Sequence, residues 1–232
     1  MFMYNPYYSA SPENAGKSYD EPETKGMSEK LKKSNGWLNE KVTYHFNKYG
    51  FRGENFKTDN NICFVGCSIT LGSGLNMEDT FSQIVANRLG MNNCNLAKGG
   101  GSMDTMFRIA YHWLPMLKPK ITVIVATGKT RSEYYDSKTK RHEALLPSMK
   151  KCNAWYISYL CNENNYEVNF TKNKYALHHL CKQINTNLIW LEHGPDFGRR
   201  LDLAKDLLHP GKESNRLMAE KILQCIKEKG IA

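Results

Sequence analysis

The 232-residue sequence has no long run of apolar residues and no N-terminal segment with the pattern of a signal peptide. These two absences argue against a membrane-spanning protein and against a secreted one. No stretch approaches the roughly 20 apolar residues that a helix needs to cross a bilayer, so we expect no membrane span. Residues 1–9 lack a positively charged start followed by an apolar run, so the sequence presents no signal peptide. We therefore expect a cytoplasmic protein.

The seven cysteines form no Cys-x-x-Cys pair and no zinc-ribbon spacing. Their number is odd and several stand among apolar residues, which is typical of reduced cysteines in a core. The nearest approach to a metal cluster is His178-His179-x-Cys181. Adjacent histidines on a helix point to different faces, so we expect no metal site there.

Positive charge dominates, with 32 Lys and Arg against 23 Asp and Glu and a formal net charge of +9. Such a balance can indicate a nucleic acid or an anionic polysaccharide as partner. The basic residues are scattered, however, and form no stripe interleaved with stacking aromatics. Nucleic-acid binding stays a minor hypothesis, which predicts steeply salt-dependent retention on DNA.

From residue 61 onward, short apolar segments alternate with helical patterns. Strands are expected at Ile62–Val65, Cys94–Ala97, Ile121–Ala126 and Asn187–Glu192, and helices at Asp79–Leu89, Ser102–Leu117, 145–161, 173–185 and Gly211–Lys229. Continuous apolar runs are typical of buried parallel strands. The alternation predicts a three-layer α/β/α sandwich with a central parallel sheet, flavodoxin-like in architecture, with right-handed crossovers.

The first part of the chain differs in composition from the rest. Residues 1–30 are polar and rich in Tyr, Pro, Glu and Ser, whereas the segment Tyr49-Gly50-Phe51-Arg52-Gly53 is aromatic. We expect residues 1–58 to form a partly irregular N-terminal arm that packs on the domain. Residues 59–232 are expected to form the domain that carries the chemistry, which is long enough for a sizeable core.

A single serine, Ser68, stands where the first predicted strand meets a turn of small residues. In open α/β sheets the active site collects where strands end, so a serine at this place can act as a nucleophile. It can equally be a residue that caps the following turn or helix. The run 62–72 does not decide between these interpretations.

A nucleophilic serine needs a general base and a carboxylate that orients the base. Asp206 and His209 are three residues apart in a predicted loop, and both can turn toward one point at the edge of the sheet. Pro210 restricts His209 to an extended conformation. An aspartate that caps a turn and a surface histidine would give the same pattern.

The glycine-rich loop Asn95–Ser102 follows the second predicted strand and can supply hydrogen-bond donors to a developing oxyanion. Such a loop could instead hold phosphate, but the chain has no GxxxxGK[ST] and no GxGxxG in a dinucleotide setting. The segment Thr127–Arg131 leaves the third predicted strand at the matching edge and can offer a further donor.

Taken together and in this order, these segments resemble the SGNH (GDSL-like) hydrolase superfamily. The family's GDSxTxG block is similar to Gly66-Cys67-Ser68-Ile69-Thr70-Leu71-Gly72, and its second-block glycine is similar to Gly100. Its GxND block falls on Gly128-Lys129-Thr130-Arg131, and its DxxH block on Asp206-Leu207-Leu208-His209. The resemblance covers about residues 60–230.

The resemblance implies a serine-dependent ester hydrolase that works through an acyl-enzyme, without metal or organic cofactor. Ser68 would be the nucleophile, His209 the general base and Asp206 the residue that orients it. The oxyanion hole would consist of the backbone N–H groups of Ser68 and Gly100, with Thr130 as third donor. The expected substrate is a small-molecule or glycan ester with a small acyl group such as acetyl.

Two positions depart from the family pattern. Cys67 replaces the aspartate beside Ser68, and its thiol could be a rival nucleophile, although the side chain should point away. Thr130 replaces the oxyanion asparagine, and Arg131 replaces the aspartate beside it. A lost oxyanion donor costs about a hundred- to a thousandfold in rate. These departures favour an alternative, a weak or inactive carbohydrate-binding module with the same fold; an acyltransferase that uses the same three residues is another.

The expected substrate-binding residues are Lys129 and Arg131, which lie with Lys98 on loops at the predicted site. Such cations could recognise an anionic substrate such as an acidic sugar or a sulfated glycan. They could instead be solvated or paired with Glu133 and Asp104. The sequence does not indicate an oligomeric state.

Overall fold

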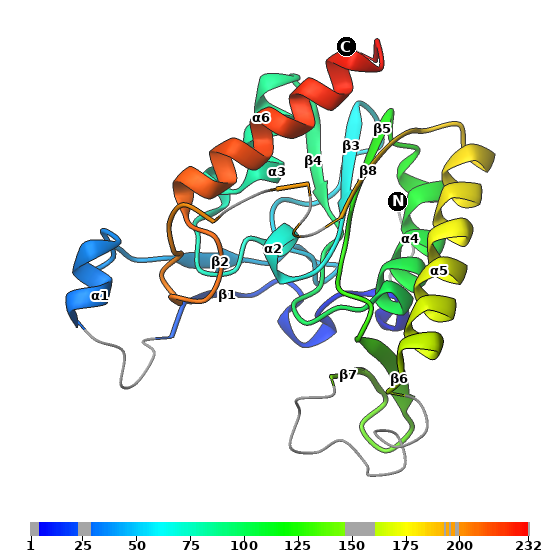
Figure 1. Ribbon diagram of the computed structural model, residues 1–232, viewed down its shortest axis with the longest axis horizontal. Helices are drawn as coiled ribbons and strands as arrows, with labels where there is room; N and C mark the ends of the chain where they lie inside the picture. The colour runs from blue at the N-terminus through cyan, green and yellow to red at the C-terminus, as the bar shows by residue number, and fades with distance from the viewer. Residues whose placement is uncertain are drawn as a thin grey trace.

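The computed structural model describes residues 5–22, 29–146, 161–192, 194, 196–197 and 200–231 (Figure 1). Its centre is a four-stranded parallel sheet with the strand order β4-β3-β5-β8. These strands are β3 (Asn61–Val65), β4 (Asn92–Asn95), β5 (Ile121–Ala126) and β8 (Asn187–Glu192). Every residue of β3 and β5 is buried, as expected for the middle of a parallel sheet that is covered on both faces.

Helices cover both faces of the sheet (Figure 1). On one face α3 (Phe81–Arg88) packs with α6 (Lys212–Glu228), and on the other α4 (Met103–Leu117) packs with α5 (Glu163–Gln183). The predicted three-layer α/β/α sandwich with a central parallel sheet is confirmed. Among the described residues, no helix combines the length and the apolar character that crossing a membrane requires.

Most predicted elements agree with the structure to within two residues at each end, and two of the differences have a clear physical cause. The second strand begins two residues earlier than predicted, at Asn92, because the amide groups of its polar residues find acceptors: Asn92 Nδ2 donates to the carbonyl of Asp59 and Asn93 Nδ2 to Ser82 Oγ. The predicted helix 173–185 begins at Glu163, because Asn162 caps it by accepting the N–H of Asn165 at 3.0 Å. Most of the predicted helix 145–161 lies outside the described residues.

The structure contains two small antiparallel sheets that the sequence analysis did not predict. In one, β1 (Ser18–Asp20) pairs with β2 (Thr43–His45). In the other, β6 (Ser132–Asp136) pairs with β7 (Arg141–Leu145). Leu145, at which the predicted helix 145–161 was to begin, is therefore the last residue of a strand. The remaining short elements are the 3-10 turns η1 (Pro6–Tyr8), η2 (Pro12–Asn14) and η3 (Met77–Asp79) and the helices α1 (Glu29–Ser34) and α2 (Ser68–Leu71).

The N-terminal residues that the structure describes lie against α4 and the segment before β3. The indole of Trp113 on α4 donates to the carbonyl of Tyr8 at 2.9 Å, and Ser9 Oγ donates to the carbonyl of Tyr49 at 2.7 Å. Trp113 is itself fully buried, and the rings of Tyr49 and Phe51 pack edge-on against it. The division of the chain at residue 58 stays a prediction.

Candidate active site

Ser68 is the first residue of α2, a helix of four residues that follows the end of β3 almost directly. The turn between them leaves no room for a side chain at position 66: a Cβ on Gly66 would lie 2.0 Å from Thr70 Oγ1. The N–H of a first helical residue has no acceptor within its own helix, so that of Ser68 is available to a ligand. The strand end therefore presents both the Ser68 hydroxyl and its N–H at the carboxyl edge of the sheet.

The side chains of Ser68, His209 and Asp206 form one continuous chain of hydrogen bonds. His209 Nε2 lies 2.8 Å from Ser68 Oγ, although the two residues are 141 positions apart. On the other side of the ring, His209 Nδ1 lies 2.5 Å from Asp206 Oδ2. The second carboxylate oxygen of Asp206 accepts the N–H groups of Leu208 at 2.9 Å and His209 at 3.0 Å.

These contacts set the charge of Asp206. Burial by itself would raise the pKa of this carboxyl, but the hydrogen bonds from the His209 ring and from the N–H groups of His209 and Leu208 lower it overall. Asp206 is therefore ionised at neutral pH, which keeps a proton on Nδ1 of His209. Nε2 is then free to accept the proton of Ser68, as a general base must.

A turn after α2 connects the serine to the loop that carries Asp206. The carbonyl of Gly74 accepts the N–H of Lys205 at 3.0 Å, and a Cβ on Gly74 would lie 3.1 Å from the carboxyl carbon of Asp206. The φ of Gly74 is 76°, in the left-handed region that favours glycine. The two segments thus approach so closely that neither can move without the other.

The side chains of Arg52 and Tyr44 form hydrogen bonds with the backbone of this turn. The sequence motifs predicted neither of them as a site residue. The guanidinium of Arg52, which is 1% exposed, donates to the carbonyls of Leu71, Gly72 and Leu75. The hydroxyl of Tyr44 accepts the N–H of Gly74 at 2.6 Å. A buried arginine whose Nη1 and Nη2 groups bind backbone carbonyls can be recognised only once the fold is known, so no sequence signal pointed to it.

The glycine-rich loop lies at the end of β4, next to the end of β3. The N–H of Lys98 donates to the carbonyl of Gly66 at 3.2 Å, which ties this loop to the turn before Ser68. The φ of Gly100 is 71°, and nothing lies within 4 Å of where its Cβ would stand, so the space on that side of its Cα is open. The structure therefore brings Ser68, Asp206, His209 and the Gly100 loop to one edge of the sheet.

The other predicted site residues follow β5. Thr130 is exposed on the turn after this strand. Lys129 is half-exposed and forms an ion pair with Glu167 of α5. Arg131 is partly buried, and its Nη1 is buried without a hydrogen-bond partner in the described part of the chain.

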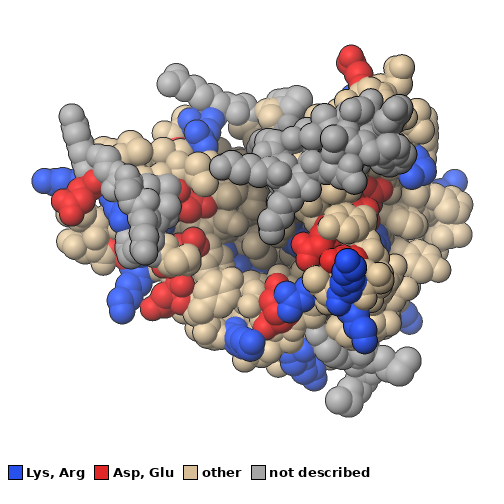
Figure 2. Space-filling view, turned by 90° about the horizontal axis from the view of Figure 1, so that it is seen from below, with Lys and Arg blue, Asp and Glu red and all other residues tan. Residues whose placement is uncertain are grey.

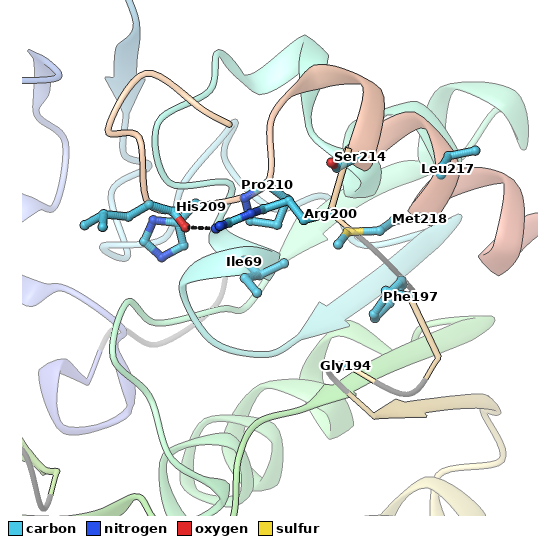
Figure 3. Close-up of a pocket in the computed structure, with 10 residues that line it drawn as sticks. Ile69, Gly194, Phe197, Arg200, His209, Pro210, Ser214, Leu217 and Met218 are labelled. Atoms are coloured by element: carbon cyan, nitrogen blue, oxygen red, sulfur yellow. Dashed lines mark hydrogen bonds between the residues drawn. The ribbon is translucent and has the colours of Figure 1, made fainter. Parts of the chain in front are cut away.

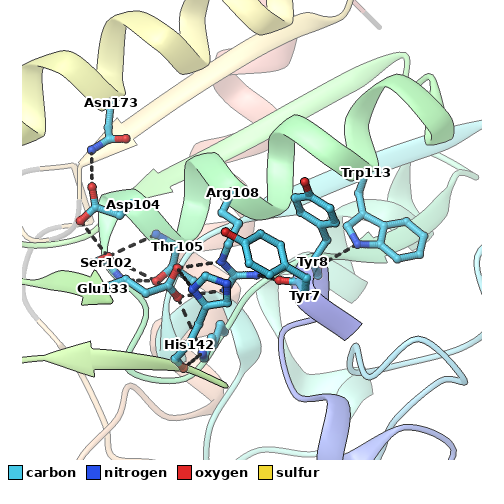
Figure 4. Close-up of polar contacts among 11 residues, drawn as sticks. Tyr7, Tyr8, Ser102, Asp104, Thr105, Arg108, Trp113, Glu133, His142 and Asn173 are labelled. Carbon is cyan, nitrogen blue, oxygen red and sulfur yellow. Dashed lines mark hydrogen bonds and ion pairs between the residues drawn. The ribbon is translucent and has the colours of Figure 1, made fainter. Parts of the chain in front are cut away.

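Lys98 faces away from Ser68, toward the β6–β7 hairpin. Its ammonium donates to the carbonyl of His142 at 2.8 Å and lies 3.7 Å from Glu133, which is one of the pairings that the sequence left open. Glu133 is 4% exposed and accepts two hydrogen bonds from Arg108 of α4, at 2.7 and 2.9 Å. Figure 4 shows this buried network, which joins α4 to both strands of the hairpin.

His142 lies in this network as a neutral side chain. Burial, together with the charges of Arg108 and Lys98, lowers its pKa to about 4 although Glu133 opposes the shift. The unfolded chain binds this proton near pH 6.5, so the folded state loses stability as the pH falls from 6.5 toward 4. We expect the urea midpoint of the wild type to fall more between pH 7.5 and pH 5 than that of His142→Phe; parallel declines would contradict this assignment.

A pocket of about 380 Å³ opens beside the imidazole of His209 (Figure 3). Its apolar wall comes from Ile69, Phe197 and Met218. Arg200 lines the other side, where its guanidinium donates to the carbonyl of Leu208. The pocket can hold a small, largely apolar group next to the hydrogen-bonded side chains.

Within the described ranges, no group of three or more His, Cys, Asp or Glu side chains could hold a metal ion. His178 packs against the ring of Trp190, and Cys181 is buried. Burial raises the pKa of the Cys181 thiol to about 12, against a smaller opposite effect of its hydrogen bond with Thr122. Cys67, beside the serine, is a buried free thiol.

No protein-family model matches the sequence, and no curated protein matches it. Matching solved structures include the psychrotrophic esterase EstA from Pseudoalteromonas sp. (15% identity, 73% of this chain and 98% of that chain covered, TM-score 0.40). They also include a G-D-S-L family protein from Desulfitobacterium hafniense DCB-2 (14%, 72% and 99%, TM-score 0.38). A third is a family two carbohydrate esterase from Clostridium thermocellum in complex with cellohexaose (15%, 78% and 67%, TM-score 0.38).

At such TM-scores we infer nothing about the reaction from the likeness. The chemistry of the site rests on the hydrogen bonds among Ser68, His209 and Asp206. The solved structures that the chain matches include an esterase and a protein of the G-D-S-L family, and the sequence motifs of the chain resemble the SGNH (GDSL-like) superfamily.

Proposed function

We propose that this protein is a serine-dependent carboxylic ester hydrolase. The observation that carries the proposal is the continuous chain Ser68 Oγ, His209 Nε2, His209 Nδ1 and Asp206 Oδ2, with distances of 2.8 and 2.5 Å. This order of nucleophile, base and carboxylate is what acyl transfer through a serine requires. Ser68 lies at the start of α2, and Asp206 and His209 lie in one loop before α6; the three meet at the edge of the sheet where ligands of such folds bind.

In the first step His209 Nε2 takes the proton of Ser68 as Oγ attacks the carbonyl carbon of the ester. The N–H groups of Ser68 and Gly100 stabilise the negative oxygen that forms. When this intermediate collapses, the alcohol leaves with the proton from His209, and the acyl group stays on Ser68. Water then attacks the acyl-enzyme while His209 takes its proton, and the carboxylic acid departs as Ser68 regains a proton.

We place the acyl group in the pocket beside His209 and expect it to be small, such as acetyl. A volume of about 380 Å³ is near the lower end for ligand pockets, which favours a short acyl group over a long lipid chain. The apolar side chains of Ile69, Phe197 and Met218 suit its methyl end.

The test is covalent labelling with a fluorophosphonate, which reacts with an activated serine. We expect an adduct on the peptide that contains Ser68 and much slower labelling of His209→Asn, because the hydroxyl then has no base. Ser73→Ala, a substitution of the other serine in the same segment, should label as the wild type does. An adduct on Cys67 would make the thiol the nucleophile, and no adduct would favour a non-catalytic binding module.

We propose Thr130 as a third oxyanion donor. Thr130→Val keeps the shape of the side chain and removes the hydroxyl, and a lost donor lowers kcat by about a hundredfold with KM little changed. Thr130→Ser retains the hydroxyl and should retain most of the activity. Hydrolysis of p-nitrophenyl acetate measures both; a Val variant as active as the wild type would remove Thr130 from the oxyanion hole.

A further inference from the structure

A second hollow, of about 660 Å³, opens between the N-terminal segment and the β6–β7 hairpin. Three tyrosines, Tyr7, Tyr19 and Tyr135, line it, and we call it the tyrosine hollow. Figure 2 views the molecule from below, the side on which the β6–β7 hairpin lies in Figure 1, and charged side chains of both signs lie on this face. None of the residues to which the reaction is assigned above lines this hollow.

The tyrosine hollow nevertheless extends to the two segments that carry Ser68 and Gly100. Leu71, the last residue of the one-turn helix that begins with Ser68, forms part of its wall. So does Gly99, the neighbour of Gly100 in the glycine-rich loop, where a Cβ would lie 3.6 Å from the side chain of Leu71. A ligand in the hollow therefore lies beside both segments that would act on the ester carbonyl.

The walls of the tyrosine hollow are fixed by the buried network of Figure 4. Arg108 donates to both carboxylate oxygens of Glu133 on β6 and to the carbonyl of Tyr7 in η1. Lys98 donates from the glycine-rich loop to the carbonyl of His142 on β7. One buried ion pair thus positions the N-terminal wall, the hairpin and the loop together, so the hollow exists before a ligand binds.

Exposed aromatic rings gather here. Tyr7, Tyr19 and Tyr135 are 43%, 41% and 47% exposed, and the rings of Tyr7 and Tyr135 lie 5.8 Å apart. Each tyrosine offers a flat apolar face and a hydroxyl at its tip. A sugar ring has the complementary form, with C–H groups on its faces and hydroxyls around its rim.

The charges around the rings favour a neutral ligand over an anion. Lys140 and Arg141 line the hollow together with two carboxylates, Glu13 and Glu143, so that the four charges balance. The ammonium of Lys98 is directed at a carbonyl and at a buried carboxylate. A hydrocarbon chain would desolvate these charged groups without replacing their hydrogen bonds, whereas sugar hydroxyls can donate to carboxylates and accept from cations.

We infer that the tyrosine hollow binds the sugar part of the ester, a neutral oligosaccharide, next to Ser68. That this sugar is part of the ester rests on the proposed function, whereas its binding in the tyrosine hollow does not. The rings of Tyr19 and Tyr135 stack on sugar faces, and Glu13 and Glu143 accept hydrogen bonds from sugar hydroxyls. The N-terminal segment and the β6–β7 hairpin, which lie outside the central sheet, would then select the substrate.

The experiment measures binding of cellotetraose, xylotetraose and mannotetraose by calorimetry, with Ser68→Ala as the background so that nothing is turned over. We expect at least one tetrasaccharide to bind, and Tyr19→Ala and Tyr135→Ala each to weaken it at least fivefold. Tyr175→Ala is the matched control, because Tyr175 is 73% exposed on α5 and does not line the hollow. Binding to no tetrasaccharide, or an equal loss in all three variants, would overturn the inference.

Hydrolysis of p-nitrophenyl acetate by the wild type separates this inference from the proposed function. Tyrosine-dependent sugar binding without any hydrolysis would leave the tyrosine hollow in place and remove the esterase. Hydrolysis without sugar binding would do the reverse. Where both occur, Tyr135→Ala should raise KM for the partially acetylated form of the tetrasaccharide that binds, relative to Tyr175→Ala.

Discussion

Ser68→Ala should lower kcat for p-nitrophenyl acetate by about a thousandfold or more, because it removes the hydroxyl that forms the acyl-enzyme. The hydroxyl that disappears is the one 2.8 Å from His209 Nε2. Folding should be unaffected, since serine to alanine at the start of a short helix removes a single oxygen. Initial rates and a thermal melt of both proteins provide the measurement.

Two further variants make this result specific. Ser73→Ala alters the same segment and should keep the wild-type rate. Since Ser68 and His209 act as one unit, the double variant Ser68→Ala/His209→Asn should be no slower than Ser68→Ala alone. Equal rates for Ser68→Ala and the wild type would refute the serine mechanism.

Arg108→Met should lower the free energy of unfolding by about 3–5 kcal/mol, because it leaves the Glu133 carboxylate buried without its main partner. The side chains of the two residues are 8% and 4% exposed, and Arg108 contacts Glu133 through two hydrogen bonds. Urea unfolding at pH 7 measures the loss. Arg88→Met is the control: its ion pair with Glu220 is 58% and 55% exposed, so its loss should cost under about 1 kcal/mol.

The pH dependence of the free energy of unfolding of Arg108→Met tests whether the unpaired Glu133 carboxylate causes this loss of stability. Burial would raise the pKa of Glu133, but the hydrogen bond and charge of Arg108, with smaller contributions from Thr105 and Lys98, lower it overall. A lowered carboxylate pKa stabilises the folded state above the unfolded value near 4.5, and this stability is lost as the pH falls below it. We expect Arg108→Met to lose that part of the acid dependence, and Arg108→Met/Glu133→Leu to recover part of the stability; a double variant no more stable than Arg108→Met would contradict an unpaired buried charge.

The parts of the fold that could be predicted are those in which local pattern and burial agree. Ile121–Ala126 has the same bounds in sequence and structure because every position of this central strand is apolar or β-branched and buried. The strand at Asn92–Asn95 lies at the edge of the sheet, where the amide groups of its asparagines find hydrogen-bond acceptors, so apolar content located it two residues late. The β6–β7 hairpin carries tyrosines and charges around a Ser-Lys-Thr-Lys turn, which lacks the usual hairpin signals.

The candidate site likewise has residues that the sequence predicts and residues that it does not. Ser68, Asp206 and His209 belong to short motifs that can be recognised in the sequence by their spacing. In the structure, hydrogen bonds join their side chains. Arg52 and Tyr44 act on a turn about 20 to 30 residues further along the chain, through backbone carbonyls and an N–H that every residue has. No pattern of side chains can disclose such a contact before the fold is known.

The contact of Gly74 with Lys205 and Asp206 has a consequence for how the protein would fail on heating. The segment that bears the serine and the loop that bears the aspartate share this backbone hydrogen bond and a van der Waals surface, besides the hydrogen bond between Ser68 and His209. Opening either segment therefore exposes both. We expect heat inactivation and cleavage by an added protease within residues 71–75 or 202–209 to occur together, as a single local event that precedes global unfolding.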